Sequence, residues 1–537
     1  MQAFKSYGTP PSPAPSATPP LEGPLIRPQR SDLLVYVAFI FPALAGFLFG
    51  YDIGGTSGAV QSLDQLAKTR GAPLGDLENA LYTSASLIGA TVGSVLVFWI
   101  GEPLGRRREL MVGSALYMLG ALISSLGDGA RTGTVVSGRI IYGLGIALSM
   151  HAAPVYISEM APANKRGLLV SLKEGFIVLG VLMGFAITAI GEATAQATSV
   201  YRIVWLPAAF VGLVVVVGMS QMPPSPRWLL LRGAAEGGHG LQPSKAGGET
   251  AALFSGGGGS GRHEAAAALR RFRRGAPEEE IQAEIAEIEL SLVESTGGGA
   301  AAGGWRAQWA EVLRARHALV AGLGLVALQQ LTGQPSVMYY QQAIFIDAGF
   351  AGAAASAAVI VGAAKLAATL VTVAYVDRFG RRPLLFIGIS MMLVALVVLA
   401  TAFAVGEPSP TEVKQIILPD AWRPVVVIAL VVYVCGYQVG FGPISWLIIS
   451  EVFPIRSRTR ALSLAVFTNF AFNLVMTFAL EPMQSGFNNL VPGGGQAVLF
   501  GLYAALCVFS LFFVNFCVPE TKGKTLEEIE EMFTGSS

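Results

Sequence analysis

The chain has 537 residues, of which 53% are hydrophobic and 13% are charged, and its mean hydropathy is +0.57. Water-soluble domains carry about a quarter charged residues, so this composition excludes a soluble multidomain protein. The net charge of +1 gives no electrostatic basis for binding nucleic acid. Cys435, Cys507 and Cys517 lie in apolar runs, and their spacing predicts neither a disulfide framework nor a metal site.

Residues 1–32 are rich in Pro and Ser and lack the apolar core of a cleavable signal peptide. We expect them to form a disordered cytosolic tail. A short organelle-targeting peptide is the alternative, and Glu22 and the prolines count against it.

Apolar segments follow, each near the roughly 20 residues that a membrane-spanning helix needs. They predict an all-α membrane protein of twelve transmembrane helices in two six-helix halves, residues 33–220 and 317–518. The predicted spans are 33–60, 79–101, 109–127, 133–158, 168–191 and 201–220 in the first half, and 317–345, 353–376, 384–405, 422–450, 461–481 and 496–518 in the second.

Residues 221–316 separate the halves and differ from them in composition. Gly-rich stretches, such as 256–261, predict flexible chain. Between these stretches Ile281, Ile285 and Ile288 recur on one helix face. We expect surface helices packed under the membrane domain, and a calmodulin-like target helix is the weaker alternative.

Basic residues gather in the loops after the second, fourth, eighth and tenth spans, as in Arg106–Arg108. Short loops rich in Lys and Arg stay on the cytosolic side of a membrane. Both termini are therefore predicted to be cytosolic, and residues 519–537 are predicted to form a cytosolic C-terminal tail.

Two signatures occur once in each half: EPLGRRREL and DRFGRRPLL begin at Glu102 and Asp377, and SEMAPANKR and SEVFPIRSR follow the fourth and tenth spans. Duplicated halves are typical of carriers that work by alternating access. The recurring acids and arginines predict a cytosolic ion-pair latch, and simple topological loop charge is the alternative. Its candidate residues are Glu102, Arg106, Arg107, Glu159, Arg166, Asp377, Arg381, Arg382, Glu451 and Arg458.

The chain resembles the sugar porters of the major facilitator superfamily. The matching motifs are FGYDIGGTSG (49–58), GRR (105–107 and 380–382), GRIIYGLG (138–145), PSPRWL (224–229), QQLTGQPSVMYY (329–340), FGPISWLIISEVFP (441–454) and PETKGKTLEE (519–528). Several of them look most like plant and algal proton–sugar symporter-like proteins. The resemblance implies symport of a monosaccharide such as glucose or xylose with a proton, and leaves the plasma membrane, vacuolar membrane and plastid envelope open.

Asp52 and Arg139 are charged residues inside predicted spans. Both are expected about 10 Å below the outer surface, from the rise per residue of a helix. An unpaired aspartate at a helix centre costs on the order of 3 kcal/mol, so the two are predicted to pair. Protonation of Asp52 would release Arg139, and in proton-coupled sugar porters an aspartate matches Asp52. A static salt bridge is the alternative. His151, about 18 Å deeper, is expected to be structural, with a second proton site as the alternative.

A sugar site needs amide side chains and an aromatic face. The candidates that these residue types suggest are Phe49, Gln329, Gln330, Gln334, Tyr339, Gly442, Trp446, Asn469 and Asn473. Gly333 and Pro335 are predicted to interrupt the seventh span beside them, as in broken carrier helices. Each candidate has an alternative, because Gln also joins helices and Trp also anchors at the interface.

In the family, positions matching Gln329, Gln330, Trp446 and Asn469 contact the sugar, and the resemblance places Glu174 where the family has a glutamine. An acid there either binds a hydroxyl or adds a titratable group. Other departures are Pro335 for an asparagine, Pro224 for the acid after the sixth span, and Thr459 for a glycine.

The expected partners are a small-molecule sugar, protons and the lipid bilayer, with no nucleic acid and no cofactor or metal, and the chain is expected to be monomeric. The alternatives are a facilitative uniporter or organellar sugar exporter, and a non-transporting sugar sensor. No nucleophile elbow or phosphate loop suggests an enzyme.

Overall fold

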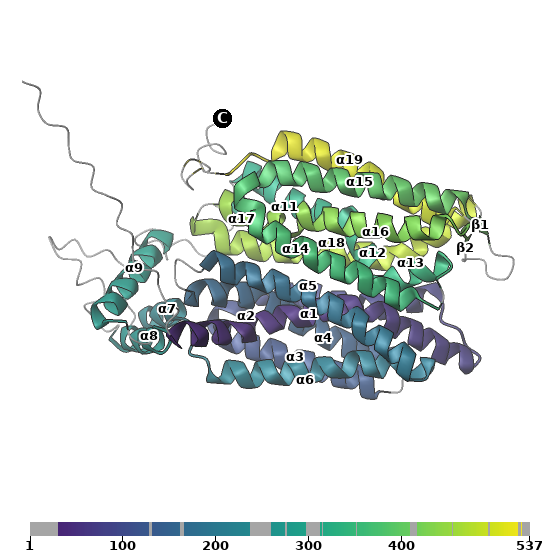
Figure 1. The fold of residues 1–537 in the computed structure, drawn as a ribbon. Helices are drawn as coiled ribbons and strands as arrows, with labels where there is room; N and C mark the ends of the chain where they lie inside the picture. The colour runs from purple at the N-terminus through teal and green to yellow at the C-terminus, as the bar shows by residue number, and fades with distance from the viewer. Residues whose placement is uncertain are drawn as a thin grey trace, which may run out of the picture.

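The computed structural model describes residues 30–127, 132–161, 166–236, 259–273, 276–296, 312–313, 315–350, 352–408, 416–453, 455–491, 494–522, 524 and 528. Two layers of long, roughly parallel helices lie side by side, and each layer is one half of the chain (Figure 1). Eleven helical segments in this described part are long and apolar enough to cross a membrane. The chain is an integral, multi-pass membrane protein.

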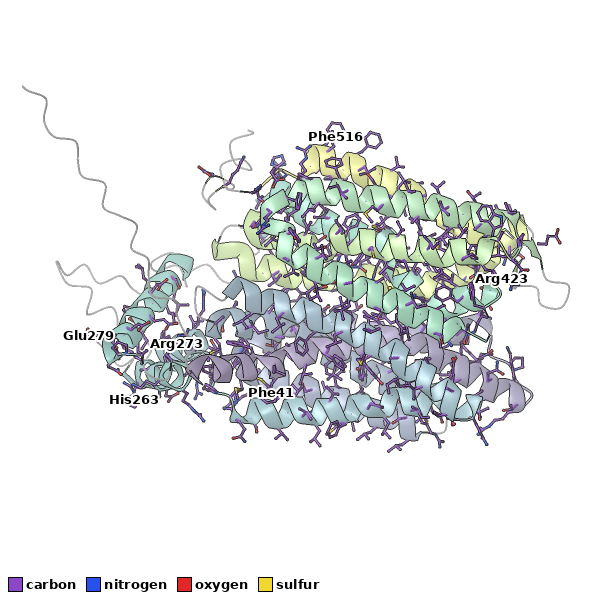
Figure 2. All side chains as sticks on the ribbon, viewed as in Figure 1. Phe41, His263, Arg273, Glu279, Arg423 and Phe516 are labelled. Atoms are coloured by element: carbon purple, nitrogen blue, oxygen red, sulfur yellow. The ribbon has the colours of Figure 1, made fainter. Side chains whose placement is uncertain are left out.

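Apolar side chains cover the outside of the bundle. Trp99, Phe210 and Phe516 are each more than two-thirds exposed, and Figure 2 shows Phe516 pointing away from the bundle. A water-soluble protein rarely leaves so many large apolar side chains exposed, so this surface is the one that faces lipid.

The first half contains six long helices. They are α1 (Arg30–Thr69), α2 (Asp76–Leu104), α3 (Arg106–Leu126), α4 (Thr132–Met160), α5 (Arg166–Thr194) and α6 (Val200–Gln221), with a 3₁₀ turn at Ala197–Ser199 before α6. Glycines let these helices approach closely. A Cβ on Gly143 of α4 would lie 1.9 Å from the carbonyl oxygen of Ser86 on α2, and one on Gly50 of α1 would lie 1.8 Å from that of Ile177 on α5.

The second half begins with a discontinuous segment. Its elements are α11 (Arg316–Leu331), α12 (Gln334–Tyr339), α13 (Gln341–Asp347), α14 (Ala354–Phe379), α15 (Arg381–Val405), α16 (Trp422–Val439), α17 (Phe441–Val452), α18 (Ile455–Leu490) and α19 (Gly495–Cys517). The predicted span 317–345 is thus three short helices, which together provide the twelfth crossing. The expected interruption is present, because Gly333 adopts φ +93°, a conformation that ends α11.

The sequence did not predict a small β-ribbon after α15. Strands β1 (Glu407–Pro408) and β2 (Ile416–Ile417) pair antiparallel, with Glu407 opposite Ile417. Each strand has only two residues, so the fold class remains all-α.

Three helices of the central segment gather at one end of the bundle, which we call the loop end (Figure 1). They are α7 (Pro226–Glu236), α8 (Gly259–Phe272) and α9 (Glu278–Thr296). Leu229, Leu269, Ile281 and Ile285 form their shared core. Arg273, visible beside this bundle in Figure 2, donates a hydrogen bond to the carbonyl of Met160 at the end of α4 (3.2 Å).

The prediction of flexible chain at 256–261 is wrong for its last residues. Gly259–Gly261 form the first turn of α8, because the missing side chain at Gly261 lets α8 approach α7 closely. A Cβ on Gly261 would lie 2.8 Å from the carbonyl oxygen of Leu229. The second Gly-rich stretch, 298–304, and residues 1–29 lie outside the described residues.

The two halves meet along α2 with α18 and along α5 with α14. At the end away from α7–α9, the opposite end, hydrogen bonds join them. The backbone N–H of Gln342 donates to Ser57 Oγ (3.1 Å), and its side-chain amide donates to Glu192. Ser485 Oγ donates to the carboxylate of Asp76 (2.7 Å). The opposite end is therefore held closed in this structure.

Candidate functional site

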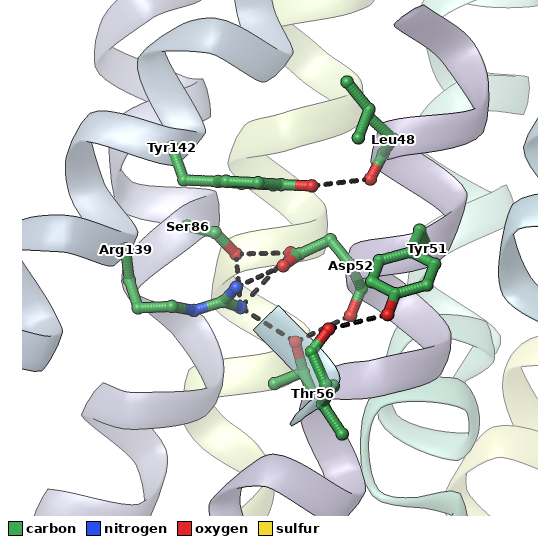
Figure 3. Close-up of polar contacts among 8 residues, drawn as sticks. Leu48, Tyr51, Asp52, Thr56, Ser86, Arg139 and Tyr142 are labelled. Carbon is green, nitrogen blue, oxygen red and sulfur yellow. Dashed lines mark hydrogen bonds and ion pairs between the residues drawn. The ribbon is translucent and has the colours of Figure 1, made fainter. Parts of the chain in front are cut away.

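A buried ion pair lies inside the first half. Asp52 on α1 and Arg139 on α4 are 2% and 1% exposed, and the guanidinium engages both carboxylate oxygens, with Nη2 3.2 Å from Oδ2 (Figure 3). The structure therefore places these two residues together, as their predicted depth required. A two-bond contact of this kind fixes orientation as well as charge.

Hydroxyl groups complete the polar shell of the pair. Ser86 Oγ donates to Asp52 Oδ2 (2.8 Å), and Arg139 Nη2 donates to Ser86 Oγ (3.0 Å) and to Thr56 Oγ1 (2.8 Å). Ser86 comes from α2, at the close contact that Gly143 permits, so the packing of α2 on α4 positions it. Thr56 lies one turn after Asp52 on α1, and helical spacing alone could have identified it.

Aromatic rings enclose the guanidinium. Its central carbon lies 5.1 Å from the ring centre of Trp205 and 5.8 Å from that of Tyr142. The Tyr142 hydroxyl donates to the carbonyl of Leu48 (2.9 Å), as Figure 3 shows. Cation–π contacts in a dry site stabilise the positive charge. The rings therefore help to stabilise the positive charge of Arg139 beside Asp52.

His151 does not reach this pair. Its Nδ1 lies 2.7 Å from Glu109 Oε1, and both side chains are buried. The sequence reasoning missed Glu109 as the partner, because it lies at the start of α3, where a boundary acid resembles a loop residue.

Amide side chains converge inside the second half. Gln329 Nε2 donates to the Tyr437 hydroxyl (2.7 Å), and Gln330 Nε2 donates to Asn469 Oδ1 (2.7 Å). The oxygens Oε1 of both glutamines are buried and accept no hydrogen bond from the described residues. Buried polar atoms normally have partners, so these two acceptors are available to a ligand.

The other candidates lie on helices α1, α12, α17 and α18. Phe49 of α1 meets Phe470, the neighbour of Asn469, edge to face at 5.7 Å between ring centres. Asn473 accepts a hydrogen bond from Thr477, which lies one turn later on the same helix (3.3 Å). Gly442 and Trp446 lie on α17, and Gln334 is the first residue of α12. Gly442 packs against the side chain of Gln438, Trp446 is partly buried and Gln334 is buried.

Tyr339, at the end of α12, interacts with the charged pair of the first half. It is buried, its hydroxyl has no hydrogen-bond partner in the described part of the chain, and it interacts electrostatically with both Asp52 and Arg139. The sequence predicts Tyr339 as part of the sugar site, whereas its recorded interactions are with the charged pair.

Glu174 on α5 is half-buried and interacts electrostatically with Lys365 on α14 and with Tyr437. The sequence does not predict Tyr437 as part of the sugar site, since a tyrosine in an apolar span carries no distinguishing signal.

At the loop end the predicted latch residues form pairs within each half. Arg106 approaches Glu159 at 3.9 Å, and Arg381 pairs with Glu451 at 2.8 Å. Ser225 and Thr521, which sequence reasoning missed, donate to Glu159 (2.5 Å) and Glu451 (2.6 Å).

Two arginines of the predicted latch have other hydrogen-bond partners. Arg107 donates to the carbonyls of Met219 (3.1 Å) and Ser220 (2.6 Å), and Arg382 donates to the backbone and side chain of Asn515. Both arginine side chains therefore bond to groups in the last turn of a helix, where backbone carbonyl oxygens lack partners within the helix. The side chains of Glu102, Arg166, Asp377 and Arg458 lie outside the described set.

The C-terminal segment docks at this latch through Glu520. Its carboxylate accepts the backbone N–H groups of Arg381 (3.1 Å) and Arg382 (3.0 Å) at the start of α15. Burial raises the pKa of Glu520, but hydrogen bonds from backbone N–H groups outweigh burial and bring its pKa below the usual value.

Comparisons with known proteins identify relatives of this chain. The family model described as "Sugar (and other) transporter" matches residues 38–242 and 259–533. The Arabidopsis thaliana protein "D-xylose-proton symporter-like 3, chloroplastic" is 41% identical over 502 residues, which are 92% of this chain and 82% of the relative. "D-xylose-proton symporter-like 2" of the same plant is 39% identical over 526 residues, covering 95% of this chain and 94% of the relative.

Among solved structures, the proton:xylose symporter XylE bound to 6-bromo-6-deoxy-D-glucose superposes with a TM-score of 0.72 at 26% identity, covering 94% of this chain and 100% of that one. The inward open conformation of XylE from E. coli gives 0.70 at 25% identity, covering 93% of this chain and 99% of that one.

Proposed function

The chain belongs to the sugar (and other) transporter family, and from that membership we propose that it carries a monosaccharide such as glucose or xylose across a membrane together with a proton. The relatives named as D-xylose-proton symporter-like and the solved proton:xylose symporter support both parts of the proposal.

The observation that carries the coupling is the buried pair of Asp52 and Arg139. An ionised carboxylate inside a membrane domain is stable only with a partner, and here the partner is a single guanidinium enclosed by aromatic rings. A proton on Asp52 removes one charge of the pair and frees Arg139 to engage Thr56 and Ser86 alone. The packing of α1 on α4 therefore differs between the two protonation states.

The discontinuous segment links this pair to the sugar. Gln329 and Gln330 end α11, and Tyr339 ends α12 beside Asp52 and Arg139. A sugar that binds the free amide oxygens and a proton that binds Asp52 thus act on one short stretch of chain between the halves. We assign the sugar contacts to Gln329, Gln330 and Asn469, with Phe49 and Trp446 beside them.

We further propose that the loop end faces the cytosol. It carries Arg106–Arg108 together with Arg381 and Arg382, and short basic loops stay on that side. With this orientation both termini are cytosolic. In sequence, the two tails flank the six-helix halves, residues 33–220 and 317–518.

The test compares two transport modes in proteoliposomes. Asp52→Asn abolishes sugar accumulation driven by an imposed pH gradient but retains counterflow exchange, because exchange needs no net proton movement. The control is Asp64→Asn, which removes a carboxylate from the same helix at a pair with Lys68 near its end and leaves both modes intact. Unchanged accumulation by Asp52→Asn would refute the assignment, and wild-type uptake indifferent to the gradient would indicate a facilitative uniporter.

A further inference from the structure

Lys365 is a buried lysine that the mechanism above does not use. It lies near the middle of α14 and is 4% exposed. Its ammonium forms no salt bridge or hydrogen bond with the residues that the structure describes. A buried ammonium without direct compensation is costly, and such residues inside membrane domains are functional by default.

The surroundings of Lys365 belong to the sugar site. Its Nζ lies 5.3 Å from the ring centre of Tyr437, and the hydroxyl of that ring accepts the hydrogen bond from Gln329. The remaining oxygen of Gln329 is one of the two buried acceptors without a partner. Tyr437 therefore contacts Lys365 through its ring and Gln329 through its hydroxyl.

A carboxylate on the other half of the molecule interacts electrostatically with this lysine. Glu174 lies on α5, which packs along α14, and it interacts electrostatically with Lys365 and with Tyr437. No direct salt bridge joins Glu174 to Lys365 in this described interface. The positive charge of the neighbouring residue Lys173 also interacts with the Glu174 carboxylate.

We propose that Glu174 and Lys365 bind the substrate between them, one from each half. This inference rests on the proposed sugar transport. The carboxylate accepts a hydrogen bond from one sugar hydroxyl, and the ammonium donates one to another. A hydroxyl both donates and accepts, so a neutral polyol satisfies two opposite charges that do not touch.

Two consequences follow from the opposite signs. An anionic sugar is repelled by Glu174 and a cationic sugar by Lys365, so the site selects uncharged substrates. The bound sugar also connects α5 of the first half with α14 of the second, and its binding favours the state in which the halves close around it.

The test measures competition against counterflow of labelled D-glucose at pH 6.5, with D-glucose, D-glucuronate and D-glucosamine as competitors. Glu174→Gln raises the apparent affinity for glucuronate relative to glucose at least about tenfold, because it removes the repulsion between like charges. Lys365→Gln does the same for glucosamine. A merely structural role would not reverse selectivity according to charge.

Further variants separate this inference from folding defects. The double variant Glu174→Gln/Lys365→Gln leaves no lone buried charge, and it binds glucose about tenfold more weakly without preferring either charged sugar. Asp64→Asn removes a carboxylate that pairs with Lys68 on α1, away from this site, and leaves selectivity unchanged.

If the double variant keeps wild-type glucose affinity, or the single variants keep wild-type selectivity, the inference is wrong although sugar transport stands. If the wild-type chain exchanges no sugar at all, the proposed function itself fails.

Discussion

At the scale of single residues, the proposed function depends on charged side chains that are energetically costly to bury inside a membrane. The pairing of Asp52 with Arg139 could be predicted from sequence, because each charge is costly alone and both lie at one depth. Ser86 and Trp205 could not, since they reach the pair through the packing of α2 and α6, and a serine or tryptophan in an apolar span has many other uses.

The first prediction concerns the energy of this pair. Arg139→Met leaves the Asp52 carboxylate buried without a cation and destabilises the fold by about 3–5 kcal/mol, the usual cost of breaking a buried pair on one side. Asp52→Asn/Arg139→Met removes both charges and recovers most of the loss. Thermal unfolding in detergent measures both effects. Simple additivity of the two single losses would show that the residues do not act as a pair.

At the scale of elements, the discontinuous segment α11–α13 brings the sugar amides near the ion pair. Gly333 and Pro335 predicted a break from sequence. The second break, at Tyr340 between α12 and α13, was not predicted, because tyrosine has no special backbone preference. The loop helices show the converse, since Gly-rich sequence suggested flexibility but tight packing of α8 on α7 made it helical.

The break at Gly333 gives a second prediction. Gly333→Ala forces a side chain into a left-handed conformation, and its Cβ would lie 2.3 Å from the Tyr503 ring. We expect a lower melting temperature and at least tenfold weaker sugar affinity, because the ends of α11 and α12 shift. Gly501→Ala is the matched control, since a Cβ there meets no atom within 4 Å and φ is not positive. Equal effects of the two substitutions would refute a special role for the break.

At the scale of the whole molecule, two halves are joined at the opposite end, and latch pairs at the loop end tie helices within each half. The sequence repeat predicted the halves and the alternating-access architecture. It could not predict which state the structure adopts, because one sequence must support states that differ by only a few kcal/mol. The partners of Arg107 and Arg382 could not be predicted either, since helix-end carbonyls leave no trace in a charge pattern.

The closed opposite end gives a third prediction. Cysteines in place of Asp76 and Ser485, whose side chains touch, allow a disulfide or short thiol crosslinker to fix the halves together. Crosslinking should stop counterflow, and reduction should restore it, because alternating access requires this end to open. The Asp76→Cys single variant, treated identically, retains transport. Full activity after complete crosslinking would contradict movement at this end.

The central claim is that sugar and proton cross together through Asp52. Proteoliposomes in weakly buffered medium, with a pH electrode outside, test it directly when sugar is added without any imposed gradient. The account predicts that the outside becomes alkaline as sugar enters with protons, and that Asp52→Asn abolishes this signal while still exchanging sugar. Sugar entry without a change in external pH in the wild-type protein would contradict it.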